Sequence, residues 1–367
     1  MTLVFCTDGL YPFALGGMQK HARLLIDELT KNNDLKIIVL HPHSEKVFAQ
    51  QNVSEVHILP IDTAKNYILE SYNFSKRVAT ELNKLQFDVI YSEGFCVWYN
   101  IDLFANKLVV NPHGLEPFQA IGFKNKLIAI PFKIIFKRIF NKAKVVISSG
   151  GILTEISNKI ILENNKVRVI PNGVNLSKKD FERSFDNKIT RVLFFARFAS
   201  NKGIDVLFSA IDELDKNNQL QNFEFTLAGK GPLYEHYLNL NKRQNVKLIG
   251  FVKDEDVETL YEQNDLFVLP TLFEGMPTVV LEAMSKKMPV IVTNVGATSS
   301  MVNEENGFLI ERNSVSQLVE AIIKFNQLSN DEKQKMANSS YQKVANNFTW
   351  QEVARQHLNL FKSITQP

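Results

Sequence analysis

Two glutamates eight residues apart, Glu274 and Glu282, flank a segment whose residue types suit the binding of a phosphorylated sugar. The apolar run 266–269 is typical of a buried strand, 274–277 of a loop, and 278–286 of a helix. One carboxylate is therefore expected just before a helix and the other inside it. Carboxylates at these two places are suited to bind hydroxyl groups on either side of an anion.

The anion would lie at the start of that helix. Pro277 is expected at the first helical position, where its fixed φ and missing N–H are tolerated. The amides of Met276 and Thr278 would then lie at a positive helix end that favours phosphate. Glu282 would lie about 7.5 Å farther along the helix axis. This order matches a nucleotide sugar, with its diphosphate at the helix end and hydroxyls at both carboxylates.

Two cations, Arg197 and Lys202, follow the predicted strand 191–196. Ligands of doubly wound sheets bind beyond the carboxyl ends of the strands, so this loop is expected on the functional edge. Two positive charges there would stabilise a departing diphosphate. The alternative is that both residues are solvated surface cations.

Glycines and a histidine at other strand ends give weaker signals. Gly16 and Gly17 follow the first predicted strand and open a helix, which permits close approach of an anion; a flexible turn remains the alternative. His113 stands just past a predicted strand, where it could donate or accept a hydrogen bond near neutral pH. The alternative is a structural loop residue. His21 alone is interpreted as an ordinary helix histidine.

Two further motifs are weaker still. The turn that contains Gly229 and Gly231 lets a backbone approach phosphate, but Tyr234 leaves the dinucleotide glycine pattern incomplete, and a plain tight turn fits as well. The acids of 254–256 resemble an Asp-x-Asp metal motif but precede a helical run, where acids cap a helix and oppose its dipole. No cluster of His, Cys, Asp and Glu has convincing metal-ligand spacing, so no metal or other cofactor is expected.

A basic amphipathic stretch occupies 122–144. The segment 118–154 contains seven Lys or Arg residues and no Asp or Glu, interleaved with Ile and Phe. Such a surface suits peripheral contact with an anionic membrane. A helix packed on its own sheet with a basic outer face is the alternative.

These candidate residues need a scaffold of strand ends, and the chain supplies one. Strand-like runs alternate with helix-length segments, which predicts parallel sheets covered on both faces. The predicted strands are 3–6, 35–40, 56–60, 88–91, 108–111, 145–148, 167–170, 191–196, 223–228, 246–250, 266–269, 289–293 and 307–310.

The alternation restarts after a loop at 171–175, which predicts two doubly wound, Rossmann-like domains that face each other across a cleft. We expect an acceptor-binding domain at 1–172 and a nucleotide-sugar-binding domain at 173–348. The last helix, 349–367, has apolar positions that need a surface, and it is expected to pack on the first domain.

Bulk composition is that of an ordinary globular protein, with 45% hydrophobic and 22% charged residues. A net charge of +3 gives no argument for nucleic acid. Cys6 and Cys96 fall in predicted strands or strand ends and are expected to be buried thiols in a reducing compartment. No signal peptide and no apolar run of membrane-spanning length is recognised. We expect a cytoplasmic protein, with peripheral attachment to the inner face of the membrane through the basic stretch.

Taken together, these segments resemble the retaining glycosyltransferases of GT-B fold, family 4, over nearly the whole chain. The strongest part is the Glu274-to-Glu282 segment with Gly275 and Pro277. Beside it stand the loop 171–175, Arg197 with Lys202 and Gly203, Gly229 with Gly231, and 306–308.

The resemblance implies roles in the second domain. Arg197 and Lys202 are expected to bind the diphosphate, and Glu282 the ribose hydroxyls. Glu274 is expected to contact the donor sugar, with the backbone of 275–277 near its phosphate.

It also implies roles elsewhere. Gly16 and Gly17 would close over the diphosphate from the first domain, and His113 would touch the transferred sugar. Phe251 and Val252 would lie near the base. Lys287 and Ser300 depart from residues common in the family, which weakens inference about the donor only.

The expected reaction is transfer of a sugar from a nucleoside diphosphate, with UDP favoured over GDP, to a hydroxyl of a glycan or lipid-linked acceptor in surface polysaccharide synthesis. The resemblance implies retention of anomeric configuration. Three alternatives stay open: a nucleotide-sugar epimerase of the same fold, a nicotinamide dehydrogenase, and a non-catalytic sugar-binding protein. The incomplete glycine pattern disfavours the dehydrogenase, and the intact set of carboxylates and cations disfavours the non-catalytic protein.

Overall fold

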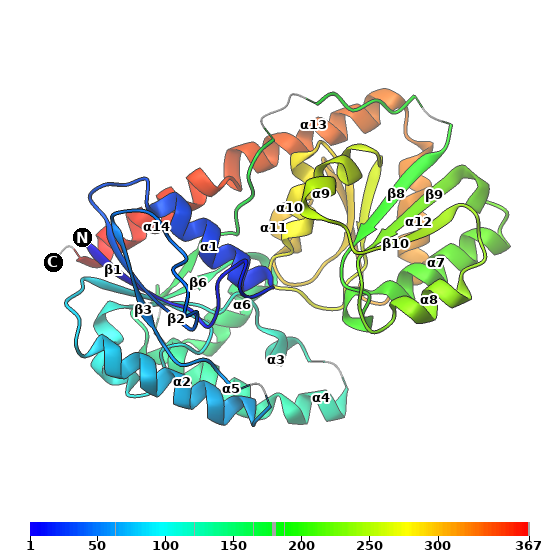
Figure 1. The fold of residues 1–367 in the computed structure, drawn as a ribbon. Helices are drawn as coiled ribbons and strands as arrows, with labels where there is room; N and C mark the ends of the chain where they lie inside the picture. The colour runs from blue at the N-terminus through cyan, green and yellow to red at the C-terminus, as the bar shows by residue number, and fades with distance from the viewer. Residues whose placement is uncertain (63, 121, 164, 178–180, 187, 366–367) are drawn as a thin grey trace. The chain divides into compact units, whose positions relative to one another are not determined.

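A computed structural model describes the whole chain except residues 63, 121, 164, 178–180, 187 and 366–367. It divides into two compact units, one made of 1–173 with 350–367 and the other of 174–349 (Figure 1). Both boundaries fall one residue later than the sequence suggested. The last helix belongs to the first unit, so this unit is discontinuous in the sequence.

The first unit is built on a seven-stranded parallel sheet in the order β3-β2-β1-β4-β5-β6-β7. Its central strands are nearly continuous apolar runs because helices cover both faces of the sheet. The strands are β1 Thr2–Cys6, β2 Lys36–His41, β3 Val53–His57, β4 Val89–Glu93, β5 Leu108–Asn111, β6 Val145–Ser148 and β7 Val167–Val169.

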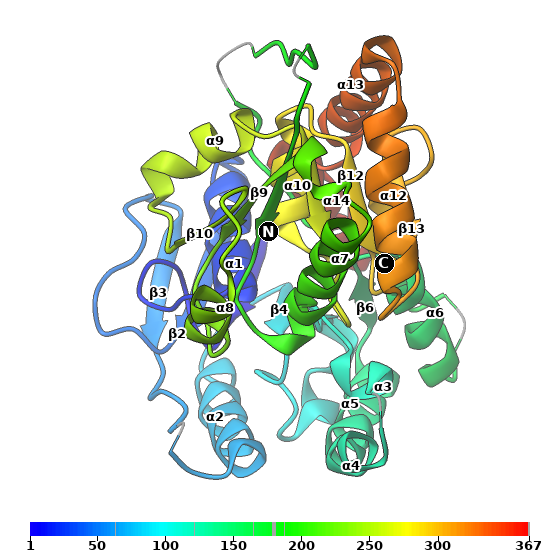
Figure 2. The ribbon, with the colours of Figure 1, turned by 90° about the vertical axis from the view of Figure 1, so that its right-hand side faces the viewer.

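Helices α1 and α14 lie side by side on one face of this sheet, and α2 and α5 lie on the other (Figures 1 and 2). Trp350, Val353 and Phe361 of α14 join the core formed by α1 and the strands, which provides the surface that this helix was expected to need. The helical segments are α1 Gly17–Leu29, α2 Tyr67–Leu82, η1 Ile101–Leu103, η2 Ala105–Lys107, α3 Glu116–Gln119, α4 Phe123–Ile128, α5 Ile130–Lys142, α6 Gly151–Ile160 and α14 Trp350–Thr365.

The second unit has a six-stranded parallel sheet in the order β10-β9-β8-β11-β12-β13. Its strands are β8 Thr190–Phe195, β9 Phe223–Ala228, β10 Val246–Gly250, β11 Leu266–Leu269, β12 Val290–Thr293 and β13 Gly307–Ile310. The predicted class, two doubly wound α/β sheets, is confirmed.

In this unit α7 packs against α12, and α10 against α13. Helix α13 begins with a capping box between Ser329 and Glu332, which supplies partners for its first backbone amides. The helical segments are η3 Ser200–Lys202, α7 Ile204–Lys216, η4 Leu220–Asn222, α8 Tyr234–Leu240, α9 Asp254–Glu262, α10 Thr278–Ser285, α11 Thr298–Met301, α12 Val315–Gln327 and α13 Asn330–Asn347.

Three local predictions need correction or refinement. The strand expected at 56–60 is β3, at Val53–His57. The predicted range was displaced toward the apolar residues of the segment. Strand β3 is an edge strand with little burial, whereas Ile58, just beyond its end, is buried. The acids of 254–256 form the first turn of α9 after Lys253 at the N-cap, so they oppose the helix dipole rather than cap the helix. The basic stretch forms two helices, α4 and α5, rather than one.

Among the described residues, no helix combines the length and apolarity needed to cross a bilayer.

Each sheet reverses its strand order at one point, between β1 and β4 in the first unit and between β8 and β11 in the second. Open α/β sheets bind ligands beyond the carboxyl ends of the strands at such a reversal. Asp8 follows β1 and Glu93 ends β4, while Lys202 lies in the loop after β8 and Glu274 in the loop after β11. Both reversal points therefore carry charged residues.

Candidate active site

At the reversal point of the second unit, Lys202 and Glu274 form an ion pair. Lys202 Nζ lies 2.5 Å from Glu274 Oε1, and the two side chains are 27% and 12% exposed. The Thr271 hydroxyl lies 3.3 Å from the same carboxylate oxygen and 2.8 Å from the Asn201 carbonyl oxygen. The sequence assigned Lys202 to the diphosphate and Glu274 to the sugar, and the fold brings their side chains together.

The loops that carry these residues are fastened to one another. The Leu272 amide donates to the Asn201 carbonyl oxygen at 2.9 Å, and the Ala297 amide donates to the Gly275 carbonyl oxygen at 2.8 Å. Gly296 has a φ of +56°, and a Cβ there would lie 2.3 Å from the Glu274 carbonyl oxygen. Only glycine fits this close approach. The three loops that follow β8, β11 and β12 therefore form one packed edge.

Helix α10 begins beside this ion pair. Pro277 is extended and occupies the N-cap, so the helix starts one residue later than the position predicted for the proline. Met276 and Pro277 are buried, whereas Gly275, just before them, is half-buried. The first amides of a helix have no carbonyl partner within it. Together with the Lys202 ammonium, this helix end can bind a phosphate group.

Glu282, inside α10, is oriented by a buried tyrosine. The Tyr261 hydroxyl lies 3.0 Å from Glu282 Oε2 and 3.2 Å from the Val279 carbonyl oxygen. Burial, followed by the charge of Glu282, raises the pKa of Tyr261 well above its ordinary value. The phenol therefore stays protonated and donates a hydrogen bond. This contact limits the rotation of the Glu282 carboxylate, which remains half-buried.

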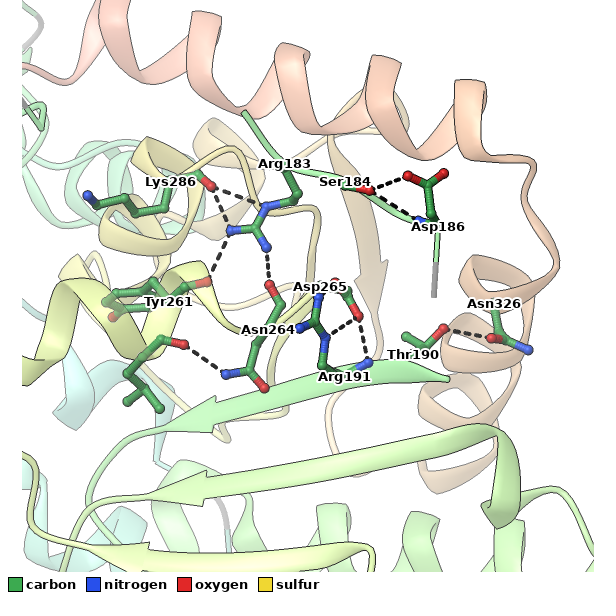
Figure 3. A network of polar contacts seen from close by, with 11 residues as sticks. Arg183, Ser184, Asp186, Thr190, Arg191, Tyr261, Asn264, Asp265, Lys286 and Asn326 are labelled. Carbon is green, nitrogen blue, oxygen red and sulfur yellow. Dashed lines mark hydrogen bonds and ion pairs between the residues drawn. The ribbon is translucent and has the colours of Figure 1, made fainter. Parts of the chain in front are cut away.

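Arg183 holds the helix ends on which this contact depends (Figure 3). Its buried guanidinium donates to the carbonyl oxygens of Tyr261 at 3.0 Å and Lys286 at 2.8 Å, and also to that of Asn264. Burial lowers the pKa of Arg183 to about 10, so the group remains charged at neutral pH. It thereby provides donors for the carboxyl-terminal carbonyls of α9 and α10.

The remaining predicted residues of this unit lie at neighbouring strand ends. In the described part of the chain, the exposed Arg197 side chain makes no ion pair, so it is available to an anion. Phe251 directly follows β10 with a 73% exposed side chain, and Val252 is half-buried. A Cβ on Gly229 would lie 2.0 Å from the Ala196 carbonyl oxygen, so tight packing against the Arg197 loop is sufficient to explain this glycine.

In the first unit, two histidines from separate elements converge on one carboxylate oxygen of Glu93. Glu93 Oε1 lies 3.3 Å from His21 Nδ1 and 3.0 Å from His113 Nε2. Glu93 and His21 are buried, whereas the His113 side chain is 14% exposed. His113 has a φ of +59° and its amide donates to Asn111 Oδ1 at 3.0 Å. His21, interpreted from the sequence as an ordinary helix histidine, is part of this cluster.

Glu93 is charged although it is buried. Burial alone would raise its pKa, but the charge of His113 and hydrogen bonds from both histidines outweigh burial and hold the pKa below its ordinary value. Burial lowers the pKa of His21, which makes its ring neutral. His21 Nδ1–H then donates to the carboxylate. Among the described residues, these three form the one group of possible metal ligands whose atoms lie within 4.8 Å of each other.

Gly16 and Gly17 are exposed at the start of α1, with Gly16 at the N-cap. A Cβ on Gly17 would meet nothing within 4 Å, so packing does not explain this glycine. Nearby, Gln19 Nε2 lies 3.3 Å from Asp8 Oδ1. Burial, followed by the charge of Glu93, raises the pKa of Asp8 to about 6.

Sequence reasoning missed Asp8, Glu93, Tyr261 and Arg183. For the first two a signal existed, because both lie at strand ends and would have been selected once the strand order was known. Tyr261 and Arg183 act through backbone and side-chain contacts made by tertiary packing. Their neighbours in the sequence give no indication of these contacts.

Comparison with known families matches the same two units. The model of glycosyltransferase family 4 matches residues 15–178, and the model of glycosyl transferases group 1 matches 177–343. An uncharacterised glycosyltransferase of Methanocaldococcus jannaschii is 26% identical over 351 residues, which cover 93% of each chain.

Two further similarities concern a part of the chain and the fold. An Escherichia coli galactosyltransferase, named for UDP-Gal and α-D-GlcNAc-diphosphoundecaprenol, is 30% identical over 182 residues that cover 45% of this chain and 46% of that protein. The structure of sucrose-phosphate synthase from Thermosynechococcus elongatus superposes with a TM-score of 0.81 at 18% identity, covering 99% of this chain and 98% of that one. The chain belongs to the group 1, family 4 glycosyltransferases and has their GT-B fold.

Proposed function

We propose that this glycosyltransferase moves a sugar from a nucleoside diphosphate, UDP in particular, to an acceptor hydroxyl with retention of configuration. The observation that carries the proposal is the Lys202–Glu274 ion pair beside the start of α10. A cation, a carboxylate and a helix end within one packed loop edge match the diphosphate and sugar of such a donor.

In the proposed reaction, the bond between the anomeric carbon and the diphosphate oxygen breaks while the acceptor oxygen bonds to the same face of that carbon. The acceptor proton passes to the departing diphosphate. Arg197 and Lys202 stabilise the negative charge that accumulates there, and Glu274 positions the sugar. His113 contacts the transferred sugar, and Gly16 and Gly17 contact the diphosphate.

We assign the nucleoside to Glu282, within α10, and to the residues that follow β10. Glu282, oriented by the Tyr261 hydroxyl, accepts hydrogen bonds from the ribose hydroxyls. The exposed ring of Phe251, with Val252, contacts the base. UDP is proposed as the nucleotide because the Escherichia coli relative is named for a UDP-sugar.

The proposed acceptor is a lipid-linked glycan of surface polysaccharide synthesis. The Escherichia coli relative is named for an acceptor attached to a lipid diphosphate. In this chain, exposed apolar and basic side chains alternate along α4 and α5, within 122–144, as expected for contact with an anionic membrane at the cytoplasmic face. We propose that no metal or other cofactor is needed, because cations of the chain stand where charge develops.

The decisive experiment combines binding with turnover. A thermal-shift screen of UDP-, GDP- and ADP-sugars is expected to single out a UDP-sugar, since a bound ligand stabilises the folded state. Release of UDP in the presence of membrane lipid extract should then depend on Lys202 and Glu282. Undiminished transfer by both Lys202→Ala and Glu282→Ala variants would overturn the assignment. Epimerised donor in the absence of acceptor would indicate an isomerase instead.

A further inference from the structure

The first unit contains an apolar pocket that the proposed donor contacts do not use. Its volume is about 320 Å³, within the range of small-molecule sites. Helices α2 and α5 and the loops after β1, β4 and β5 line it. Most of its lining is apolar, with Tyr67, Phe95, Phe132 and Phe136 as its aromatic walls.

These aromatic residues run from the surface into the unit. Tyr67 is 46% exposed, so it lies at the mouth, with its ring centroid 6.3 Å from that of Phe132. Phe95 packs on Phe136 at 4.7 Å, and Phe136 is only 5% exposed. The pocket is therefore open at one end and apolar at depth.

Charge determines what the pocket can hold. Its charged lining residues are both acidic, Asp8 and Glu116, and no Lys or Arg is found among the described residues that line it. A phosphate group inside would face two carboxyls and lose its hydration without gaining a cation. The occupant must be uncharged and predominantly apolar.

The adjacent face of α5 has the opposite character. Ile130, Lys133, Ile134 and Lys137 follow the spacing i, i+3, i+4 and i+7, which places them on one face of the helix. Ile130 and Ile134 are 46% and 63% exposed. Within the described chain, neither lysine makes an ion pair, whereas Arg138 and Lys142 of the same helix both pair with Asp102.

One helix thus presents aromatic rings to an apolar pocket and, on its outer face, two ammonium groups that have no carboxylate partner among the described residues. The Lys133 ammonium lies 5.7 Å from the centroid of the Phe118 ring. We propose that the pocket binds the first part of the hydrocarbon chain of a lipid-phosphate acceptor, while Lys133 and Lys137 bind its phosphate. The inference rests on the proposed function and deepens it, because it assigns the lipid part of the acceptor to residues of this chain. The exposed apolar side chains of α4, Phe123, Leu127 and Ile128, extend the surface for the rest of the lipid.

The test is a calorimetric titration of the full-length protein without vesicles, using farnesyl phosphate below its aggregation concentration. Farnesol supplies the chain alone and inorganic phosphate the head group alone. Farnesyl phosphate is expected to bind at least about tenfold more tightly than either. Equal affinity for farnesyl phosphate and inorganic phosphate would overturn the proposal that the pocket binds the hydrocarbon chain.

Variants separate the two parts of the site. Phe132→Asp introduces a charge at the half-buried wall of the pocket. It should lower the affinity for both farnesyl phosphate and farnesol by about tenfold or more. Leu162→Asp makes the same change at an 88% exposed position of the same unit, outside the pocket lining, and should leave both affinities unchanged. The double variant Lys133→Gln, Lys137→Gln should lower the affinity for farnesyl phosphate and leave the affinity for farnesol unchanged. Equal effects of Phe132→Asp and Leu162→Asp would refute the proposal.

Two outcomes keep this inference distinct from the proposed function. Binding to anionic vesicles with no binding of soluble farnesyl phosphate would mean that α4 and α5 only attach the protein to a membrane, and the pocket proposal would fail. These titrations need no donor, so UDP-sugar binding measured by thermal shift on the same preparations tests the transferase separately.

Discussion

Lys202 Nζ and Glu274 Oε1 lie 2.5 Å apart, so each is the counter-ion of the other in the free protein. The proposed donor would give each of them a different partner, phosphate for the ammonium and hydroxyls for the carboxylate. The ion pair keeps both side chains oriented before the donor binds. It also prevents a partly buried charge from being left alone.

Replacing Lys202 by methionine should lower kcat by about a hundredfold, because one of the two cations proposed to stabilise the departing diphosphate is lost. Lys253→Met is the matched control, since Glu255 is the one partner of the Lys253 ammonium among the described residues and both side chains are over 70% exposed. Steady-state measurement of UDP release would compare the two variants. A rise in KM alone, with kcat unchanged, would argue that Lys202 binds the donor equally in the ground state and the transition state.

The Tyr261→Phe variant tests the orientation of Glu282. Removal of the hydroxyl frees the carboxylate to rotate and should weaken UDP binding by about three- to tenfold, with kcat at saturating donor nearly unchanged. Calorimetric titration with UDP measures the affinity. Tyr341→Phe, on α13, is a control for loss of a phenol. If Tyr261→Phe binds UDP as tightly as the wild type, the proposed role of this contact is wrong.

Gly296→Ala tests the packed loop edge. The added Cβ would meet the Glu274 and Gly275 carbonyl oxygens, both at 2.3 Å, and must displace the loop that positions them. Activity should fall by about tenfold or more even where the protein remains folded. Ser299→Ala, at an exposed neighbouring position, should behave as wild type. Circular dichroism would establish folding before UDP release is measured.

Asp8 should make the protein less stable as pH rises. Its pKa is about 6 in the fold against an ordinary value of 3.8, so between these values the folded state binds a proton that the unfolded state does not. This contribution is fully present below the unfolded pKa and is lost as pH rises through the folded pKa. The free energy of unfolding of the Asp8→Asn variant should therefore exceed that of the wild type by up to about 3 kcal/mol at pH 7.5 and by little at pH 4.

Urea unfolding at several pH values checks this sign, with Asp34→Asn, at an exposed position, as the control. The buried His357 contributes with the opposite sign, because burial lowers its pKa to about 3 and its share of stability is lost as pH falls below its ordinary value of 6.5. The comparison must therefore be made between variant and wild type at each pH. If the stability gained by Asp8→Asn over the wild type grew toward low pH, the raised pKa of Asp8 would be contradicted.

Chelation tests the proposed independence from metal. Dialysis against EDTA should leave the rate of transfer unchanged, because Arg197 and Lys202 are proposed to supply the positive charge at the diphosphate. The His21, Glu93 and His113 group offers three ligand atoms, so added zinc is the informative second arm. Zinc should raise neither the rate nor the melting temperature. Loss of activity on chelation, restored by a divalent ion, would reverse this part of the proposal.

Much of the fold was predictable from the sequence because buried parallel strands are continuous apolar runs. The bounds of β5, β6 and β9 match the predicted ranges, whereas the edge strand β3, with few buried residues, was displaced by its apolar neighbour Ile58. Lys202 and Glu274 were selected separately from their loops. Their contact depends on β8 and β11 being neighbours, and strand order is not written in local residue patterns.

The cluster around Glu93 escaped prediction for a similar reason. His21, Glu93 and His113 come from α1, the end of β4 and the loop after β5. His113 was selected because it follows a strand, whereas His21 and Glu93 look ordinary within their own segments. Arg183 is a further case. Its three carbonyl partners are separated from it by 78 to 103 residues, so only the folded chain identifies its role.

The discontinuous first unit has a consequence for synthesis on the ribosome. Trp350, Val353 and Phe361 belong to the core that α1 and the first strands build. This core stays incomplete until residues 350–361 have been translated, because they follow the whole of the second unit in the sequence. The unit formed by 174–349 is contiguous and can complete its own core earlier. Nascent chains stalled before residue 350 should therefore expose the apolar side of α1 to chaperones, although the strands of this unit precede the second unit in the sequence.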